Sequence, residues 1–268
     1  MWHHQASCIA ADGSEISATH SLFQNNQGGD VIFARTASTV DVAHSTFKEN
    51  VAKAAAGPRH LSEGGATISL WEASVATLNE VSFIGNTGVA AGAIVVTGES
   101  AVAIDLGRFS GNVASANTEC CAAGAVIFAN QRAQVTSSQS SFDGNKASAQ
   151  LSAGAIYGSD GATITLTDAT LSRNEAVGSL FGAGAVYADK SGVSLTRVSI
   201  SLNTAKGATT LTRANYADAL YVSSPLHIFI RDSGFNPLVW GGQTMSITPR
   251  IVNPGAPIHR GSDRGVAH

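Results

Sequence analysis

The chain has few charged residues, few cysteines and no long apolar run, and each shortage excludes a class of protein. Only 13% of its 268 residues are charged, and its 16 basic residues leave a net charge of −3. This charge gives no positive surface for a nucleic-acid backbone. No segment approaches the ~18 to 20 consecutive apolar residues that a membrane-spanning helix needs. We therefore expect neither a nucleic-acid partner nor a transmembrane segment.

The cysteines and histidines do not indicate a metal centre. Cys8, Cys120 and Cys121 are too few for a disulfide framework, and two adjacent cysteines lack the spacing of metal ligands. Cys120 and Cys121 can form a strained vicinal disulfide or pack as small apolar side chains, and we expect the packing. His3-His4 and His20 have no accompanying set of carboxylates or thiols. We predict no cofactor.

The two ends of the sequence differ from its middle. The start lacks the basic and then apolar layout of a signal peptide, so the protein is either not exported or an internal piece of a longer exported chain. The end is rich in Pro, Gly, Ser and Arg, which predicts an extended or disordered tail. We expect an N-terminal segment over 1–11, a repeat domain over 12–240 and the tail over 241–268.

A short motif recurs through the middle of the chain at intervals of about 30 residues. It begins with an aromatic or aliphatic residue and ends, three positions later, with asparagine. The leading residues are Phe23, Phe47, Phe83, Phe109, Phe142, Leu171 and Ile200, and the asparagines are Asn26, Asn50, Asn86, Asn112, Asn145, Asn174 and Asn203. Uneven intervals are typical of a constant core interrupted by loops of variable length.

A second motif follows each copy of the first. It is a Gly-Ala step before a β-branched or aromatic run, as in Gly124-Ala125-Val126-Ile127 and Gly154-Ala155-Ile156-Tyr157. Residues seven and five positions before each leading residue are almost all apolar, whereas those six and four before it are mostly polar. This alternation predicts strands with one buried and one wet face.

Strands this short cannot bury an apolar face alone, so neighbouring repeats must stack and share one core. The predicted fold is all-β, a single-stranded right-handed parallel β-helix of about eight coils. The phenylalanines should point inward and stack along the axis. The asparagines should sit at the bend in left-handed backbone and bond to one another as a ladder.

These paired motifs resemble the repeats of the polymorphic outer membrane protein family, over residues 12 to 240. Four copies have Ala where that family's second motif has its first Gly, at Ala91, Ala123, Ala153 and Ala183. The resemblance implies a right-handed parallel β-helix that acts in adhesion, and it implies a location at the cell surface or outside the cell.

The loops between each asparagine and the next Gly-Ala step vary most, and variable loops on a rigid scaffold often carry binding. They cover residues 51–63, 87–90, 113–122, 146–152, 175–182 and 204–217. The candidate binding residues among them are Arg59, His60, Phe181, Arg213 and Tyr216. We predict a non-enzymatic module that contacts a glycan, a cell surface or matrix.

An enzyme is the main alternative. A polysaccharide lyase or glycoside hydrolase of the pectin-lyase-like β-helix type needs clustered carboxylates. Glu80, Asp105 and Asp168 lie on or beside the wet strand face, but the intervening coil supplies Ser138 and Gln139. At most two of these carboxylates can meet.

Three further alternatives are open. Glu72 and Glu99 have the same offset from their Gly-Ala steps, so they could hold calcium between consecutive coils. A ladder of hydroxyls on three successive coils could order water and bind ice, and it consists of Thr136, Ser138, Thr165, Thr167, Ser194 and Thr196. The module could also be a purely structural spacer.

Overall fold

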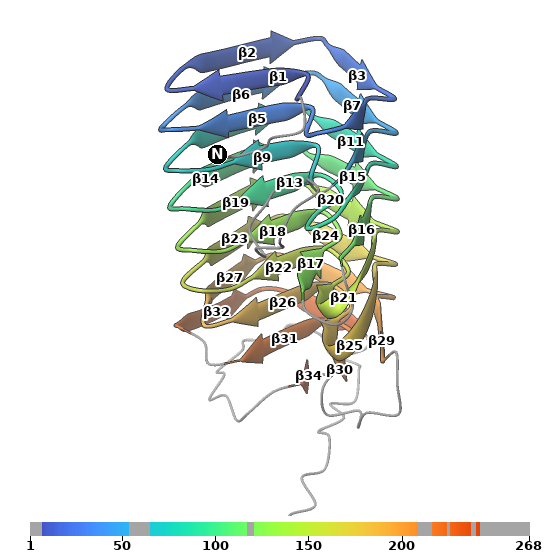
Figure 1. The fold of residues 1–268 in the computed structure, drawn as a ribbon. Coiled ribbons are helices and arrows are strands. Elements are labelled where there is room, and N and C mark those ends of the chain that lie inside the picture. The colour runs from blue at the N-terminus through green and yellow to red at the C-terminus, as the bar shows by residue number, and fades with distance from the viewer. Residues whose placement is uncertain are drawn as a thin grey trace, which may run out of the picture.

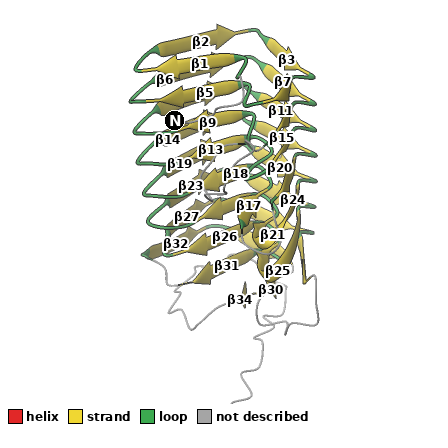
Figure 2. Ribbon diagram, in the orientation of Figure 1, coloured by secondary structure: helices red, strands yellow, loops and turns green. Residues whose placement is uncertain are grey.

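The computed structural model describes residues 7–53, 65–116, 121–207, 216–223, 226–236 and 240–241. Within these ranges the chain forms strands joined by turns, without a helix (Figure 2). The strands assemble into four parallel sheets, here called A, B, C and D, and each coil visits them in that order (Figure 1). The predicted right-handed parallel β-helix of about eight coils is confirmed.

Sheets A and B contain the first two strands of each coil. Sheet A comprises β1 (Ile9–Asp12), β5 (Ile32–Arg35), β9 (Ile68–Leu70), β13 (Ile94–Val96), β18 (Ile127–Ala129), β22 (Ile156–Gly158), β26 (Val186–Asp189), β31 (Leu220–Ser223) and β34 (Trp240–Gly241). Sheet B comprises β2 (Glu15–Thr19), β6 (Thr39–Ala43), β10 (Val75–Asn79), β14 (Ala101–Asp105), β19 (Gln134–Ser138), β23 (Thr163–Thr167), β27 (Gly192–Thr196) and β32 (His227–Arg231).

Sheets C and D close the coil. Sheet C comprises β3 (Leu22–Gln24), β7 (Thr46–Lys48), β11 (Ser82–Ile84), β15 (Arg108–Ser110), β20 (Ser141–Asp143), β24 (Thr170–Ser172), β28 (Ser199–Ser201) and β33 (Gly234–Asn236). Sheet D comprises β4 (Gln27–Gly28), β8 (Val51–Ala52), β12 (Thr87–Gly88), β16 (Val113–Ser115), β21 (Lys146–Ala153), β25 (Glu175–Ala183) and β29 (Thr204–Gly207). Two further strands, β17 (Ala122–Gly124) and β30 (Tyr216–Ala217), pair with the ends of β21 and β25.

The five phenylalanines form one stack along the inside of sheet C. Consecutive rings lie 4.7 to 5.2 Å apart between centroids and are nearly parallel. Phe47, Phe83, Phe109 and Phe142 are at most 1% exposed, and Leu171 and Ile200 continue the row. The stacked rings therefore fill the core on this side of the coil.

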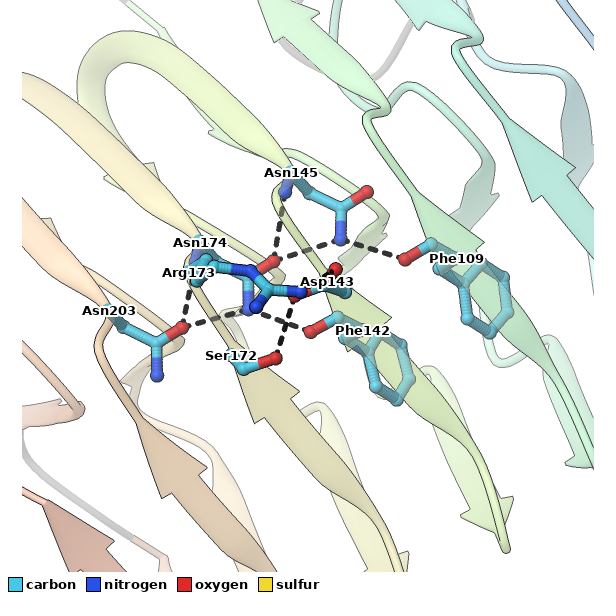
Figure 3. Close-up of polar contacts among 8 residues, drawn as sticks. All are labelled: Phe109, Phe142, Asp143, Asn145, Ser172, Arg173, Asn174 and Asn203. Carbon is cyan, nitrogen blue, oxygen red and sulfur yellow. Dashed lines mark hydrogen bonds and ion pairs between the residues drawn. The ribbon is translucent and has the colours of Figure 1, made fainter.

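The motif asparagines form a buried amide ladder beside this stack (Figure 3). Asn145 Nδ2 donates to Asn174 Oδ1 at 2.9 Å and to the carbonyl oxygen of Phe109 at 3.1 Å. The backbone N–H of Asn145 donates to the same Asn174 Oδ1 at 3.0 Å. Each interior amide thus uses both its donors and its acceptor, which satisfies buried polar groups that would otherwise be costly.

One expectation about the ladder is wrong. The left-handed residue at the bend is the one before the motif asparagine, for example Glu49 at φ 53° and Arg173 at φ 55°. The asparagine itself avoids this conformation because its side chain must point inward along the axis to meet the next amide.

A second, smaller core lies outside the coil, on the outer face of sheet A. Phe128, Tyr157, Tyr187 and Tyr221 stack there with centroids 5.0 to 5.3 Å apart. The far ends of β21 and β25 pack onto this stack through Leu151 and Phe181. Sheet A is therefore buried on both faces over these coils.

The described residues include no helix that is long and apolar enough to cross a membrane.

Candidate functional site

The turn from sheet A to sheet B, here called the AB turn, repeats with nearly constant geometry. In four coils the N–H of its fourth residue donates to the carbonyl oxygen of its first, at 3.1 to 3.4 Å. Its two central residues have positive φ, and they are Thr36-Ala37, Glu72-Ala73, Gly98-Glu99, Gln131-Arg132 and Asp160-Gly161. These are the φ signs of a type I′ turn, which favours Asn and Gly. The AB turns stack along the left edge of Figure 2.

Because most central residues of the AB turns are not glycine, their backbone is strained. Ala73 has φ 62°, where a Cβ costs roughly 1 to 2 kcal/mol, partly offset by the ~0.5 to 1 kcal/mol of chain entropy that glycine loses on folding. We expect Ala73→Gly to raise the free energy of unfolding by about 0.5 to 1 kcal/mol, as measured by urea denaturation. Ala101→Gly, on β14, should instead lower it. A loss of stability in Ala73→Gly would contradict the strain.

The first residues of four successive AB turns form a column, here called the AB column: Trp71, Thr97, Asn130 and Ser159. Backbone bonds fix their register, since the N–H of Thr97 donates to Leu70 and that of Asn130 to Val96. Trp71 is half-buried, and its ring centroid lies 6.4 Å from that of Phe33. Trp71 Nε1 and Asn130 Oδ1 are buried, and neither has a hydrogen-bond partner in the structure.

The polar side chains around the AB column are already paired. Thr36 Oγ1 donates to Glu72 Oε2 at 3.1 Å, and Thr97 Oγ1 donates to Gln131 Oε1 at 2.9 Å. Glu99 forms an ion pair with Arg132 on the next coil. The charges of Glu99 and Arg132 therefore compensate each other, whereas Glu72 accepts from a neutral hydroxyl and keeps its negative charge.

Glu72 and Glu99 have the same offset from their Gly-Ala steps but not the same position in the stacked coils, so the expectation that they lie opposite each other is wrong. Ile68 pairs with Ile94, and the N–H of Ala73 donates to Gly98, which places Glu72 beside Gly98 rather than Glu99. The Gly-Ala step is displaced by one residue between these two coils. In the described part of the chain no group of three or more His, Cys, Asp or Glu side chains could hold a metal.

Each of the three candidate catalytic carboxylates is engaged by a side chain of a neighbouring coil, and Glu80 and Asp105 lie on adjacent coils. Glu80 Oε2 lies 3.1 Å from His44 Nδ1, whose ring stacks on His20 at 4.9 Å. Asp105 accepts a 2.7 Å bond from the Ser138 hydroxyl.

Asp168 accepts two 2.6 Å bonds from Arg197, and this guanidinium lowers the pKa of Asp168. The coil containing Ser138 lies between Asp105 and Asp168, so these two carboxylates do not meet. A general acid needs a raised pKa, and Asp168 has the opposite shift.

Asp143 shows the same arrangement on sheet C (Figure 3). Arg173 donates to its Oδ2 at 2.5 Å and Ser172 to its Oδ1 at 2.7 Å, and the bond from Arg173 holds the pKa of Asp143 below its ordinary value of 3.8. A carboxyl with a lowered folded-state pKa stabilises the fold above its unfolded-state pKa, and this contribution disappears as the pH falls through the folded-state value.

We expect the wild-type free energy of unfolding to fall as the pH drops below about 4, where the unfolded-state carboxyls take up protons. The Asp143→Asn variant should lose less free energy of unfolding on acidification than the wild type, because it lacks the contribution of this carboxyl. Arg173→Gln should reduce the acid-induced loss by the same amount, and the double variant should reduce it by no more than either single variant. Urea denaturation at pH 7, 4, 3 and 2 measures all four proteins, and an unchanged acid profile in Asp143→Asn would contradict the pairing.

Few of the predicted binding residues can be placed. Arg59, His60 and Arg213 lie outside the described residues, and only the backbone of Tyr216 is described, in β30. Phe181 is half-buried, with its ring centroid 5.6 Å from that of Tyr221. Phe181 therefore contributes to the outer core.

The predicted hydroxyl ladder lies in register on the outer face of sheet B. Thr136 pairs with Thr165 and then Ser194, while Ser138 pairs with Thr167 and then Thr196. Asp105 continues the second row on the preceding coil and binds Ser138. Ice binding by this face stays a prediction.

The cysteine expectation is wrong in one respect. Cys121 is disulfide-bonded, although it also packs, as expected, against a buried cluster of alanines in and beside sheet D. Cys8 is a free thiol, and its Sγ lies 3.2 Å from Asn26 Oδ1 at the first rung of the amide ladder.

Trp71 and Asn130 were not among the residues that the sequence singled out. Their signal is weak: each occupies the position just after the strand of sheet A, where other coils have Thr97 or Ser159. That position becomes informative only once the register of the coils is known.

Comparison with protein-family models, with curated proteins and with solved structures finds no match to this chain. Its function must therefore be argued from its own geometry.

Proposed function

We propose that the chain is a non-enzymatic β-helix module of a surface or secreted protein, and that it binds carbohydrate or matrix. The observation that carries the proposal is the state of the candidate catalytic carboxylates. Asp105 and Asp168 lie two coils apart, and each binds a hydroxyl or guanidinium of a neighbouring coil. Such groups are poorly suited to transfer protons to a substrate.

The scaffold favours display over catalysis. The phenylalanine stack and the amide ladder hold successive coils in fixed register, while the loops between sheets D and A differ in length from coil to coil. Rigid repeats with variable loops create extended binding surfaces. The paired sequence motifs support kinship with the polymorphic outer membrane protein repeats, from which we infer a location at the cell surface or outside the cell.

A binding assay and an activity assay test this proposal together. The recombinant chain is screened on a glycan array and on matrix proteins, and is incubated with uronate-containing polymers in the presence of calcium. We expect binding without release of unsaturated ends or reducing sugars. Turnover that disappears in Asp105→Ala or Asp168→Ala would overturn the proposal in favour of a lyase or hydrolase.

A further inference from the structure

We propose that the AB column is a subsite for a neutral sugar, with Trp71 and Asn130 as its principal contacts. This inference rests on the proposed function and names the ligand class and the residues that recognise it. It moves the expected contact from the loops to the turns between sheets A and B, at the left of Figure 1.

The first observation behind this inference is that two buried polar atoms of the AB column have no hydrogen-bond partner. Asn130 is 7% exposed, and its Oδ1 accepts no hydrogen bond, while the buried Trp71 Nε1 donates none. A buried polar group without a partner costs about 1 to 3 kcal/mol. Here a donor and an acceptor lie two coils apart, roughly 10 Å at ~4.8 Å per coil.

The chemistry of these two atoms selects a hydroxyl-bearing ligand. Trp71 Nε1 can only donate, and Asn130 Oδ1 can only accept, so one ligand must supply both an acceptor and a donor. A hydroxyl group does both. A molecule with several hydroxyls spaced over this distance matches both atoms, which it reaches when the Trp71 and Asn130 side chains turn outward from their buried positions, and a saccharide is such a molecule.

The aromatic side chains supply the apolar part of the site. Trp71 is half-buried, and Phe33 lies beside it at a 45° interplanar angle. Binding sites for small molecules combine aromatic surface with a few fixed polar groups. The indole ring can pack against the C–H face of a pyranose while its Nε1 and the Asn130 amide bind hydroxyls.

The surrounding charges favour a neutral sugar over an acidic one. A uronate needs an unpaired cation beside Trp71 or Asn130, but Arg132 is paired with Glu99, and Arg35, one coil before Trp71, donates to Asp12 at 2.7 Å. The lysine nearest the other end of the AB column, Lys190, lies on the turn of the coil after Ser159, level with Asp160. Glu72 adds a negative charge beside Trp71 that would repel a carboxylate. A neutral saccharide binds without breaking either ion pair.

The test uses an array of neutral and uronate-containing glycans, with Trp71→Ala and Asn130→Leu as variants. Both are expected to lose at least tenfold in affinity for the neutral glycan that binds best. Phe229→Ala removes a half-exposed aromatic ring on sheet B, and Asn79→Leu removes an amide there, so both controls should bind as the wild type does.

Stability separates a ligand contact from a structural one. Asn130→Leu removes a buried acceptor that has no partner, so its melting temperature should equal or exceed that of the wild type while its binding falls. If Trp71→Ala does not fold, Trp71→Phe keeps an aromatic face but removes Nε1, and it should bind more weakly than the wild type.

The outcomes are distinguishable. Glycan binding that survives in Asn130→Leu and in the Trp71 variants would overturn the subsite but leave the proposed function intact. Binding confined to uronate glycans would overturn the ligand class. A wild-type chain that binds no glycan and no matrix preparation would remove the proposed function and this inference together.

Discussion

Replacing Phe109 with alanine should lower the free energy of unfolding by about 3 to 5 kcal/mol, the usual cost of removing a buried phenylalanine. The ring is 1% exposed and stacks on Phe83 and Phe142 at 5.2 and 4.8 Å, so both contacts and volume disappear. Since each coil is stabilised only by its neighbours, the loss should also broaden the unfolding transition.

Urea denaturation followed by circular dichroism measures this effect. Leu106→Ala is the matched control, because that side chain is 40% exposed and should change stability by less than about 0.5 kcal/mol. Phe142→Ala should repeat the large loss. If both phenylalanine variants melted like the wild type, the stacked rings would not be the core.

Asn112→Ala should cost a similar amount, on the order of 3 to 5 kcal/mol, because several buried partners lose their bonds at ~1 to 3 kcal/mol each. Asn112 Oδ1 accepts from the backbone N–H and the Nδ2 of Asn86, and its own Nδ2 donates to the Phe83 carbonyl oxygen and to Asn145 Oδ1. Alanine leaves all four groups without that partner in a dry interior.

A matched amide on the surface isolates the ladder's contribution. Asn79 is half-exposed on sheet B, so Asn79→Ala should be nearly neutral. Asn112→Asp should remain destabilised at pH 7, because a carboxylate keeps the acceptor but loses the donor and places a charge in the core. Equal stabilities for Asn112→Ala and Asn79→Ala would contradict a structural role for the ladder.

The fold could be predicted because its determinants repeat. The spacing between Phe47 and Asn50 returns in every coil of the core, and each return independently indicates the same stacking. The alternation of apolar and polar residues predicted which side chains of sheet B face the core, and Val40, Val102 and Ile164 are indeed buried. Repetition therefore supplied many consistent signals for one arrangement.

The site was harder to predict because it depends on the register between coils and on which side chains cover the outer face of a sheet. The one-residue displacement between Glu72 and Glu99 arises where the Gly-Ala step shifts against the strand pairing, which no local pattern encodes. The outer core was missed although Tyr157, Tyr187 and Tyr221 each follow an inward-facing residue. Outward positions on a sheet are usually wet, and these are dry because side chains such as Leu151 and Phe181, together with several alanines, pack over them.

The amide ladder also has a direction. Every interior rung donates from its Nδ2 toward the Oδ1 of the following coil, as Asn86 does to Asn112 and Asn112 to Asn145. Such aligned amides polarise one another in one sense along the rod. A ladder of this kind can be extended only by an amide that points in the same direction. Two such rods could therefore join the donor end of one ladder to the acceptor end of the other, but not two ends of the same kind.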